Sequence, residues 1–426
     1  MTTATTTARP VNPLVVERAD PWILKSGDTY FFTGSFPAFD RIVLRGADTL
    51  AGLSDAPEVT IWTRPSEGEM GGNIWAPELH QIADKWYFYF TAGHADKPFR
   101  IRMYAIEGVG ADPRTAVWSE PRRIDGGWDE FALDATVFEH RGDLFYVWAQ
   151  RPVQEPGLPD GVVINSDMYI ARMSDPFTLA TEPTLLTRPT LAWENVGYRV
   201  NEGAAVLKRN DKIFITFSAS ATDYNYAMGL LTADQDADLL DPTSWHKTPE
   251  PVLVSSDLTR SYGPGHNSFT TDEQGNDVLV YHARSYRDII GNPLFDPNRH
   301  GRIQPFFFDE AGNPAFGLPV GDGQVPVQVV GETGKILAVS EDSIVSAPVG
   351  GNVVGEAWQE PVPVPELTVT ELASATRTQV GTTATLFRVI TQDGAVLRLA
   401  PVVSPGHEVD FDLARFPALG GTINLQ

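Results

Sequence analysis

Short segments in which apolar and aromatic residues alternate or cluster recur along most of the chain. Examples are TYFFTG, WYFYFTAG, LFYVWAQ, IFITFSAS and DVLVYHAR, and Gly, Asp or Asn residues that favour turns separate them from their neighbours. This pattern is typical of β-strands joined in hairpins, whereas helical periodicity is almost absent. The sequence therefore predicts an all-β fold.

Each of these segments is the second strand of a predicted hairpin, and an ionisable residue stands at the start of the first strand. We call this residue the head of the repeat, and successive heads are roughly 60 residues apart. The five head residues are Asp20, Glu78, Asp134, Glu202 and His266. A repeat of this length cannot bury both faces of its own sheet, so it must stack on copies of itself. Because β repeats near this period usually close into a ring, we predict a five-bladed β-propeller.

The predicted propeller covers residues 14–330 and follows an N-terminal extension at residues 1–13. Its blades are expected at residues 14–70, 71–127, 128–195, 196–257 and 258–325. Residues 335–426 contain fewer aromatics and a proline-rich connector, WQEPVPVPEL, followed by alternating segments. They predict a small C-terminal β module of sandwich type, which is either a structural appendage or a carbohydrate-binding unit.

Composition and charge narrow the classes of partner. The chain of 426 residues is 42% hydrophobic, which is enough for a large core, and it has no cysteine for disulfides or thiolate chemistry. Its net charge of −23 would repel nucleic acid and anionic membranes, so a neutral partner fits best. No apolar run marks a signal peptide or a membrane span. We therefore expect a cytoplasmic protein, or a secreted one if a leader has been removed.

Ring closure would gather the head residues around one axis, and three of them are carboxylic acids. Asp20 lies in ADPWI, Asp134 in FALDATVF and Glu202 in VNEGAAVL. Each could be structural by itself, since an Asp before Pro commonly caps a turn and an Asp among apolar residues can be part of a buried scaffold. Their matching places in three repeats favour a shared catalytic role.

Several carboxyl groups in an aromatic-rich pocket for a neutral ligand suit the hydrolysis of glycosides. One carboxylic acid must be protonated to donate to the leaving oxygen, and one carboxylate must activate water or attack the anomeric carbon. A third carboxylate raises the pKa of the acid through like-charge repulsion. Such a reaction needs no organic cofactor.

Motifs from every predicted blade occur in order across residues 12–325. They are ADPWI, WAPEL with KWYFYF, LDATVF, NEGAAVL with FSAS, and GPGHNSF with YHAR and DPNRHGRIQ. The set resembles glycoside hydrolase family 43, and in particular its α-L-arabinofuranosidases and β-xylosidases. The resemblance implies an inverting single displacement with Asp20 as general base and Glu202 as general acid. It assigns Asp134 to orienting the acid and tuning its pKa, with the base and acid carboxyl groups roughly 6.5–9.5 Å apart.

The same resemblance places His266 on the propeller axis, where an imidazole often meets a calcium ion or a water molecule. Taken alone, a His after Gly is more often a turn residue. Phe36 and Trp75 are candidate sugar-stacking rings, because apolar sugar faces pack on aromatics.

Three further polar residues complete the set of candidates. Arg284 in YHAR is expected in the pocket, where it would bind sugar hydroxyls. Arg302 could serve there or in a structural ion pair, and Glu78 is expected to support the site rather than to catalyse.

We expect an enzyme that releases terminal α-L-arabinofuranosyl residues from arabinan or arabinoxylan saccharides. The alternatives are a β-D-xylosidase with the same mechanism and a non-catalytic sugar-binding propeller. The sequence leaves open the sugar, the linkage, exo or endo action and the oligomeric state.

Overall fold

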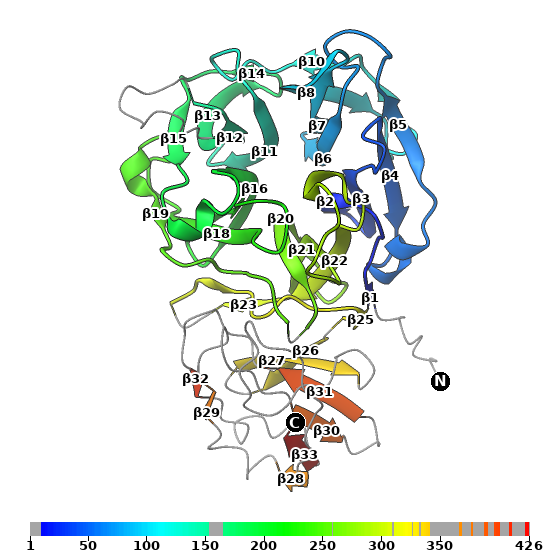
Figure 1. Cartoon of the computed structure of the whole chain (residues 1–426), viewed down its shortest axis with the longest axis vertical. Helices are drawn as coiled ribbons and strands as arrows, with labels where there is room; N and C mark the ends of the chain where they lie inside the picture. The colour runs from blue at the N-terminus through cyan, green and yellow to red at the C-terminus, as the bar shows by residue number, and fades with distance from the viewer. Residues whose placement is uncertain are drawn as a thin grey trace.

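Five β-sheets stand around a common axis as the blades of a ring (Figure 1). The computed structural model describes residues 10–152, 165–257, 259–308 and 311–325, and beyond these only the backbone of strands between residues 327 and 425. Each blade is an antiparallel meander whose strands pair mainly in chain order. The predicted five-bladed β-propeller is confirmed.

The first three blades follow one another along the chain. Blade 1 consists of β2 (Ala19–Ser26), β3 (Thr29–Ser35), β4 (Arg41–Ala47) and β5 (Val59–Thr63). Blade 2 consists of β6 (Ile74–Ile82), β7 (Lys85–His94), β8 (Lys97–Val109), β9 (Val117–Trp118) and β10 (Arg122–Arg123). Blade 3 consists of β11 (Ala132–His140), β12 (Asp143–Gln150), β13 (Asp167–Asp175), β14 (Thr178–Leu179) and β15 (Thr184–Thr187).

The last two blades complete the ring. Blade 4 consists of β16 (Asn201–Arg209), β17 (Lys212–Ala219), β18 (Ala227–Asp234) and β19 (His246–Lys247). Blade 5 consists of β20 (Tyr262–Thr271), β21 (Asp277–Arg284) and β22 (His300–Pro305), and β23 (Phe307–Phe308) then pairs with β24 (Pro314–Ala315). The helices of the described part are single 3₁₀ turns, namely η1 (Ala51–Ser54), η2 (Ala192–Glu194), η3 (Pro242–Ser244) and η4 (Pro293–Phe295). No helix in these described segments is long and apolar enough to cross a membrane.

The start of the chain pairs with the last blade. β1 (Val11–Asn12) is hydrogen-bonded to β25 (Gly323–Gln324), and the backbone N–H of Leu14 donates to the Gly301 carbonyl at 2.9 Å. The Asn12 amide also donates to the Ile303 carbonyl at 2.9 Å and accepts from the Ile303 N–H at 3.0 Å. Part of the predicted N-terminal extension therefore contributes to the ring, while the division into domains stays a prediction.

The core is divided into five apolar clusters, one at each interface between blades. The middle strands supply both faces because successive side chains of a strand point in opposite directions. In β7, for example, Phe88 packs toward blade 1 whereas Tyr87 and Tyr89 pack toward blade 3. This two-sided burial explains why these strands are almost continuously apolar.

Every innermost strand has a register shift at an equivalent place, with one residue in the left-handed region. These residues are Asp20 (φ 54°), Ala76 (φ 46°), Asp134 (φ 55°), Gly203 (φ 60°) and His266 (φ 42°). The shift therefore defines which positions of the five blades are equivalent. Asp20, Asp134 and His266 match as expected, but Glu202 lies one residue before this position and Glu78 lies two residues after it.

The described strands of the C-terminal region pair mainly in one sheet, in the order β26-β27-β31-β30-β33-β28. They are β26 (Val327–Gly331), β27 (Gly334–Ser340), β28 (Glu366–Thr368), β30 (Phe387–Ile390), β31 (Val396–Ala400) and β33 (Thr422–Leu425). A separate pair joins β29 (Thr376–Arg377) to β32 (Val409–Asp410). The connecting residues lie outside the described part of the chain, so the sandwich-like fold of this module stays a prediction.

Candidate active site

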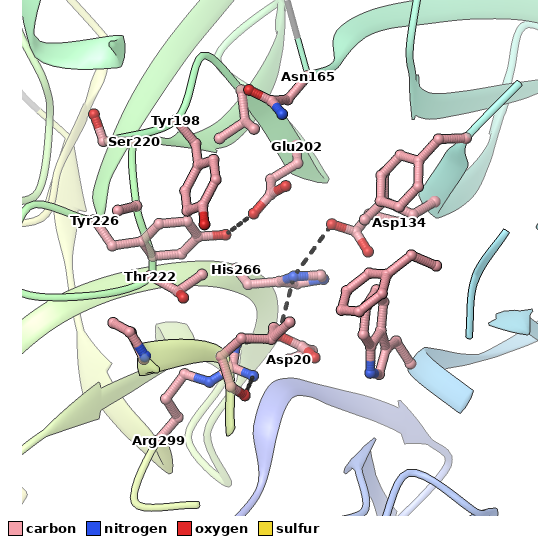
Figure 2. Close-up of a pocket in the computed structure, with 18 of the residues that line it drawn as sticks. Asp20, Asp134, Asn165, Tyr198, Glu202, Ser220, Thr222, Tyr226, His266 and Arg299 are labelled. Carbon is pink, nitrogen blue, oxygen red and sulfur yellow. Dashed lines mark hydrogen bonds and ion pairs between the residues drawn. The ribbon is translucent and has the colours of Figure 1, made fainter. Parts of the chain in front are cut away.

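A pocket of about 430 Å³ is lined by residues from all five blades. Asp20, Asp134, Glu202 and His266 lie together in it, although they come from four different innermost strands (Figure 2). The left-handed backbone at three of these residues re-aims each side chain where the strand bulges. Such strained, bulged positions commonly mark functional sites.

Asp20 is held as a carboxylate by donors on several sides. The Ser35 hydroxyl donates to its Oδ2 at 2.5 Å, and Arg299 Nη1 and His266 Nδ1 lie 3.6 and 3.2 Å from its Oδ1. Burial acts to raise the pKa of Asp20, but the charges of His266, Arg299 and His282 and the Ser35 hydrogen bond outweigh it and hold the pKa at about 2. Asp20 is therefore ionised near neutral pH.

The surroundings of Glu202 favour its protonated form, whereas those of Asp20 favour the ionised form. Burial raises the pKa of Glu202 to about 7, and the charge of Asp20 acts in the same direction. The hydroxyl of Tyr226 donates to Glu202 Oε1 at 2.9 Å and, together with Arg299, opposes this rise. A large part of Glu202 is therefore protonated near neutral pH.

Asp134 is 5% exposed and lines the same pocket as the other two acids. Burial, followed by the charges of Glu202, Asp20 and Glu78, raises the pKa of Asp134 well above its usual value. A hydrogen bond from the Gly203 backbone N–H favours the ionised form and opposes this rise. Because like charges act on each other, Asp134 and Glu202 titrate as a pair rather than independently.

His266 lies between carboxylates, with Nδ1 3.2 Å from Asp20 Oδ1 and 3.6 Å from Asp134 Oδ2. Burial lowers the pKa of His266 although Asp20 opposes this effect. A calcium ion needs about six to eight oxygen ligands, and no three His, Asp or Glu side chains of the described segments are arranged to hold a metal. These side chains do not fit a directly bound calcium ion.

The arrangement places an ionised acid, Asp20, in one pocket with two acids whose pKa values are raised, Asp134 and Glu202. In Figure 2 the carboxyl groups of Asp20 and Glu202 lie on opposite sides of the His266 ring. Two carboxyl groups with separated pKa values can act as base and acid at the same pH.

Comparison with known proteins assigns the chain to a family. A family model described as "Glycosyl hydrolases family 43" matches residues 10–314. The chain belongs to glycoside hydrolase family 43. The resemblance inferred from the blade motifs is thereby confirmed, and the family makes the protein a glycoside hydrolase.

Two curated proteins and one solved structure show which family 43 enzymes this chain is similar to. Alpha-L-arabinofuranosidase 43 of Humicola insolens is 48% identical over 329 residues, which cover 77% of this chain and 67% of the relative. The extracellular exo-α-(1→5)-L-arabinofuranosidase of Streptomyces avermitilis is 50% identical over 319 residues, which cover 74% of this chain and 65% of the relative. The crystal structure of an α-L-arabinofuranosidase from Lactobacillus brevis has a TM-score of 0.69 and 49% identity, and the match covers 74% of this chain and 98% of that one.

These matches show how much of each relative the chain covers, and they correct the expected location of the protein. The chain matches about two thirds of the length of the first two relatives. The Streptomyces avermitilis protein is named extracellular, and this overturns our expectation of a cytoplasmic location, which rested on the absence of an apolar leader.

We expected two aromatic residues, Phe36 and Trp75, to contact the sugar, and only Trp75 lines the pocket. Trp75 lines the pocket and packs edge-to-face against Phe39 and Phe99, at 5.9 Å between ring centroids in each case. Phe36 is not among the lining residues. Its ring lies under the guanidinium groups of Arg18 and Arg41, at 4.7 and 4.9 Å, so the expected sugar contact is not supported.

Arg284 is also absent from the lining, contrary to expectation. It is 1% exposed, and its guanidinium donates to Asp296 Oδ1 at 3.1 Å and to the carbonyls of Thr222 and Pro293 at 2.7 and 2.8 Å. Because Thr222 and Pro293 themselves line the pocket, Arg284 shapes the wall from behind rather than touching the ligand.

Arg302, which we expected either in the pocket or in a structural ion pair, and Glu78, which we expected to support the site, both have partners outside the pocket lining. Arg302 pairs with Asp322 at 2.6 Å. Glu78 is 4% exposed, contacts His80 Nε2 at 2.8 Å and lies outside the pocket lining, as expected for a supporting residue.

Sequence reasoning missed Tyr226 and Arg299, which both line the pocket and contact a carboxyl group. Arg299 lies inside the DPNRHGRIQ motif, so it could have been considered together with Arg302. Tyr226 stands in a loop-like stretch, YNYAMG, that carries no motif of its own.

Proposed function

We propose that this family 43 protein is an inverting exo-α-L-arabinofuranosidase that removes terminal arabinofuranosyl residues from neutral arabinose-containing saccharides. The observation that carries the proposal is the pairing, in one pocket, of an ionised Asp20 with a largely protonated Glu202. The names of the relatives support arabinose as the released sugar, and that of the Streptomyces avermitilis protein supports exo action.

In the proposed reaction the ionised Asp20 takes a proton from a water molecule, which attacks the anomeric carbon. Glu202 donates its proton to the glycosidic oxygen, so the leaving saccharide departs as an alcohol. Both events occur in a single displacement, and the configuration at the anomeric carbon is inverted.

Asp134 and Arg299 keep the two acids in their different states. Arg299 stabilises the negative charge of Asp20, so the base is ready at neutral pH. Asp134 binds the N–H next to Glu202 and favours retention of one proton by the pair. An ion near His266 remains an expectation from the resemblance, and the proposed steps do not need one.

The reaction class is tested with two activated substrates in parallel. We expect hydrolysis of 4-nitrophenyl α-L-arabinofuranoside to exceed that of the β-D-xyloside, which is the substrate of the alternative enzyme. ¹H NMR of the first-formed sugar should show the β-anomer of arabinose, because inversion changes the configuration of an α-linked residue. The α-anomer would reject inversion, a preference for the xyloside would replace the substrate, and inactivity on both would favour a sugar-binding protein.

Exo action is tested separately on linear α-1,5-arabinan. An exo-enzyme should release free arabinose from the first minutes while the polymer shortens slowly. Early appearance of mixed oligosaccharides would show attack on internal linkages.

A further inference from the structure

Tyr226 connects the two acids of the pocket although the proposed reaction gives it no task. Its hydroxyl donates to Glu202 Oε1 at 2.9 Å. Its ring stacks on His282, with 5.6 Å between ring centroids and 8° between the planes. His282 Nδ1 in turn accepts the backbone N–H of Asp20 at 3.1 Å. A chain of three direct contacts therefore joins the acid to the base.

The local sequence provides room for the Tyr226 ring. A Cβ atom built on Gly265 would lie 2.4 Å from Tyr226 Cε1, which is closer than real side-chain contacts allow. A Cβ on Gly263 would lie 3.6 Å from Tyr226 Cβ and would clash at 2.4 Å with the carbonyl oxygen of Asp223. The two glycines of the GPGH motif thus lack side chains where the ring is seated. This packing fixes the ring, and hence the hydroxyl, relative to β20.

The hydroxyl contacts only one of the two oxygens of Glu202. Within the described segments, Oε1 accepts the Tyr226 hydrogen bond while Oε2 has no protein partner. Burial, with the charges of Glu202, Asp134 and Asp20, raises the pKa of Tyr226 well above 10, so the phenol remains protonated and can donate at every working pH.

We propose that Tyr226 is a positioning residue that binds Oε1 of Glu202, so that Oε2 carries the proton toward the leaving saccharide. This inference rests on the proposed role of Glu202 as general acid. Stacking on His282 and the space left by Gly265 hold the phenol in the required direction.

Removal of the hydroxyl changes one hydrogen bond and no charge. Besides Tyr226, the other titratable or charged groups that line the pocket with Glu202 are Asp20 (β2), Asp134 (β11), Arg151 after β12, Tyr198 before β16, His266 (β20) and Arg299 before β22. All of them remain in Tyr226→Phe. A hydrogen bond to the carboxylate stabilises the ionised form of Glu202, so its loss should raise the pKa of Glu202.

The test compares wild type and Tyr226→Phe on two leaving groups. On α-1,5-arabinobiose, whose alcohol leaving group needs the proton, kcat should fall about 10-fold with little change in KM. On 4-nitrophenyl α-L-arabinofuranoside, which leaves with less help, the loss should be a few-fold at most. The alkaline limb of the pH–rate profile should move upward by roughly 0.5–1 unit. Equal losses on both substrates with an unmoved profile would overturn the proposal.

Tyr104→Phe is the matched control. The Tyr104 hydroxyl is also buried, but among the described residues it has no hydrogen-bond partner, and it lies outside the pocket lining. This variant should keep the wild-type rates and pH profile. A second variant, Gly265→Ala, displaces the ring without removing the hydroxyl and should show the same leaving-group dependence as Tyr226→Phe. A wild-type ratio of the two rates in Gly265→Ala would contradict the packing argument.

A direct titration separates this inference from the proposed function. Carboxyl ¹³C NMR, with Glu202→Gln to assign the resonance, should show a higher Glu202 pKa in Tyr226→Phe than in wild type whether or not any glycoside is hydrolysed. An unchanged titration would reject the contact. A changed titration in a protein inactive on arabinosides would reject only the function.

Discussion

The Asp134 carboxylate accepts a hydrogen bond from the backbone N–H of Gly203, the residue that follows Glu202 in the next blade. Other boundaries between blades have a comparable contact, in which a side chain on the second strand of one blade binds the N–H of the bulged residue of the next. These contacts are Ser35 with Ala76, Ser218 with His266 and His282 with Asp20. The third blade has Ala149 at this place, so Asp134 itself provides the acceptor.

Asp134→Asn should shift the alkaline limb of the pH–rate profile to lower pH. The amide oxygen can still accept from Gly203, but the second titrating carboxyl of the pair is lost. The two carboxyl groups no longer hold a proton jointly against mutual repulsion, so the pKa of Glu202 should fall and the acid form should disappear at lower pH. The pH dependence of kcat/KM measures this shift, and we expect a rate loss of about 10-fold or more at pH 7. An unmoved limb with wild-type rates would show that Asp134 is only structural.

Asp20→Asn should reduce kcat by about 10²- to 10⁴-fold without unfolding the protein. Asparagine has the size of aspartate and can still accept from Ser35, but it cannot take a proton from water. Circular dichroism and the melting temperature serve as controls for the fold, and the rate is measured on 4-nitrophenyl α-L-arabinofuranoside. Wild-type turnover in a folded variant would remove Asp20 from the role of base.

Arg299→Met should shift the acidic limb of the profile to higher pH. Arg299 lies 3.6 Å from Asp20 and helps to hold the pKa of that carboxyl at about 2. Without this cation the pKa of Asp20 rises by roughly 1 unit or more, and the base becomes protonated at a higher pH. Arg299→Lys keeps the charge and should shift the limb less. If both variants moved the limb equally, shape rather than charge would be the cause.

The repeat period and the cluster of acids could be predicted from the sequence. The residue of each innermost strand that occupies the bulged position could not. Alternation of side chains predicts the strands and their turns, and the spacing of the heads predicts the ring. A bulge, in contrast, depends on one residue in the left-handed region, which Ala76 adopts as well as Gly203 does. Glu78 and Glu202 therefore resembled equivalents of Asp20 although neither occupies its position.

The partners of long polar side chains could not be predicted from the sequence either. Arg284 stands in a motif of the last blade, yet its donors are used by Asp296 and by two backbone carbonyls. Backbone acceptors leave no trace in the pattern of side chains. Tyr226 was missed for a related reason, because its partners Glu202 and His282 come from other strands.

Gly203→Ala should destabilise the fold and slow the enzyme more than the matched substitution Gly27→Ala. Both glycines have φ of +60°, so alanine pays the same backbone cost of about 1–2 kcal/mol at each site. Gly27 has open space around its position, whereas a Cβ on Gly203 would lie 3.1 Å from His266 Cγ and 3.2 Å from His266 Nδ1. The additional crowding should cost roughly 1 kcal/mol or more and displace either His266 or the adjacent Glu202. Chemical denaturation measures the difference in the free energy of unfolding, and kcat should fall only in Gly203→Ala. Equal destabilisation with unchanged turnover in both variants would show that the close approach of His266 to Gly203 is not needed for the site.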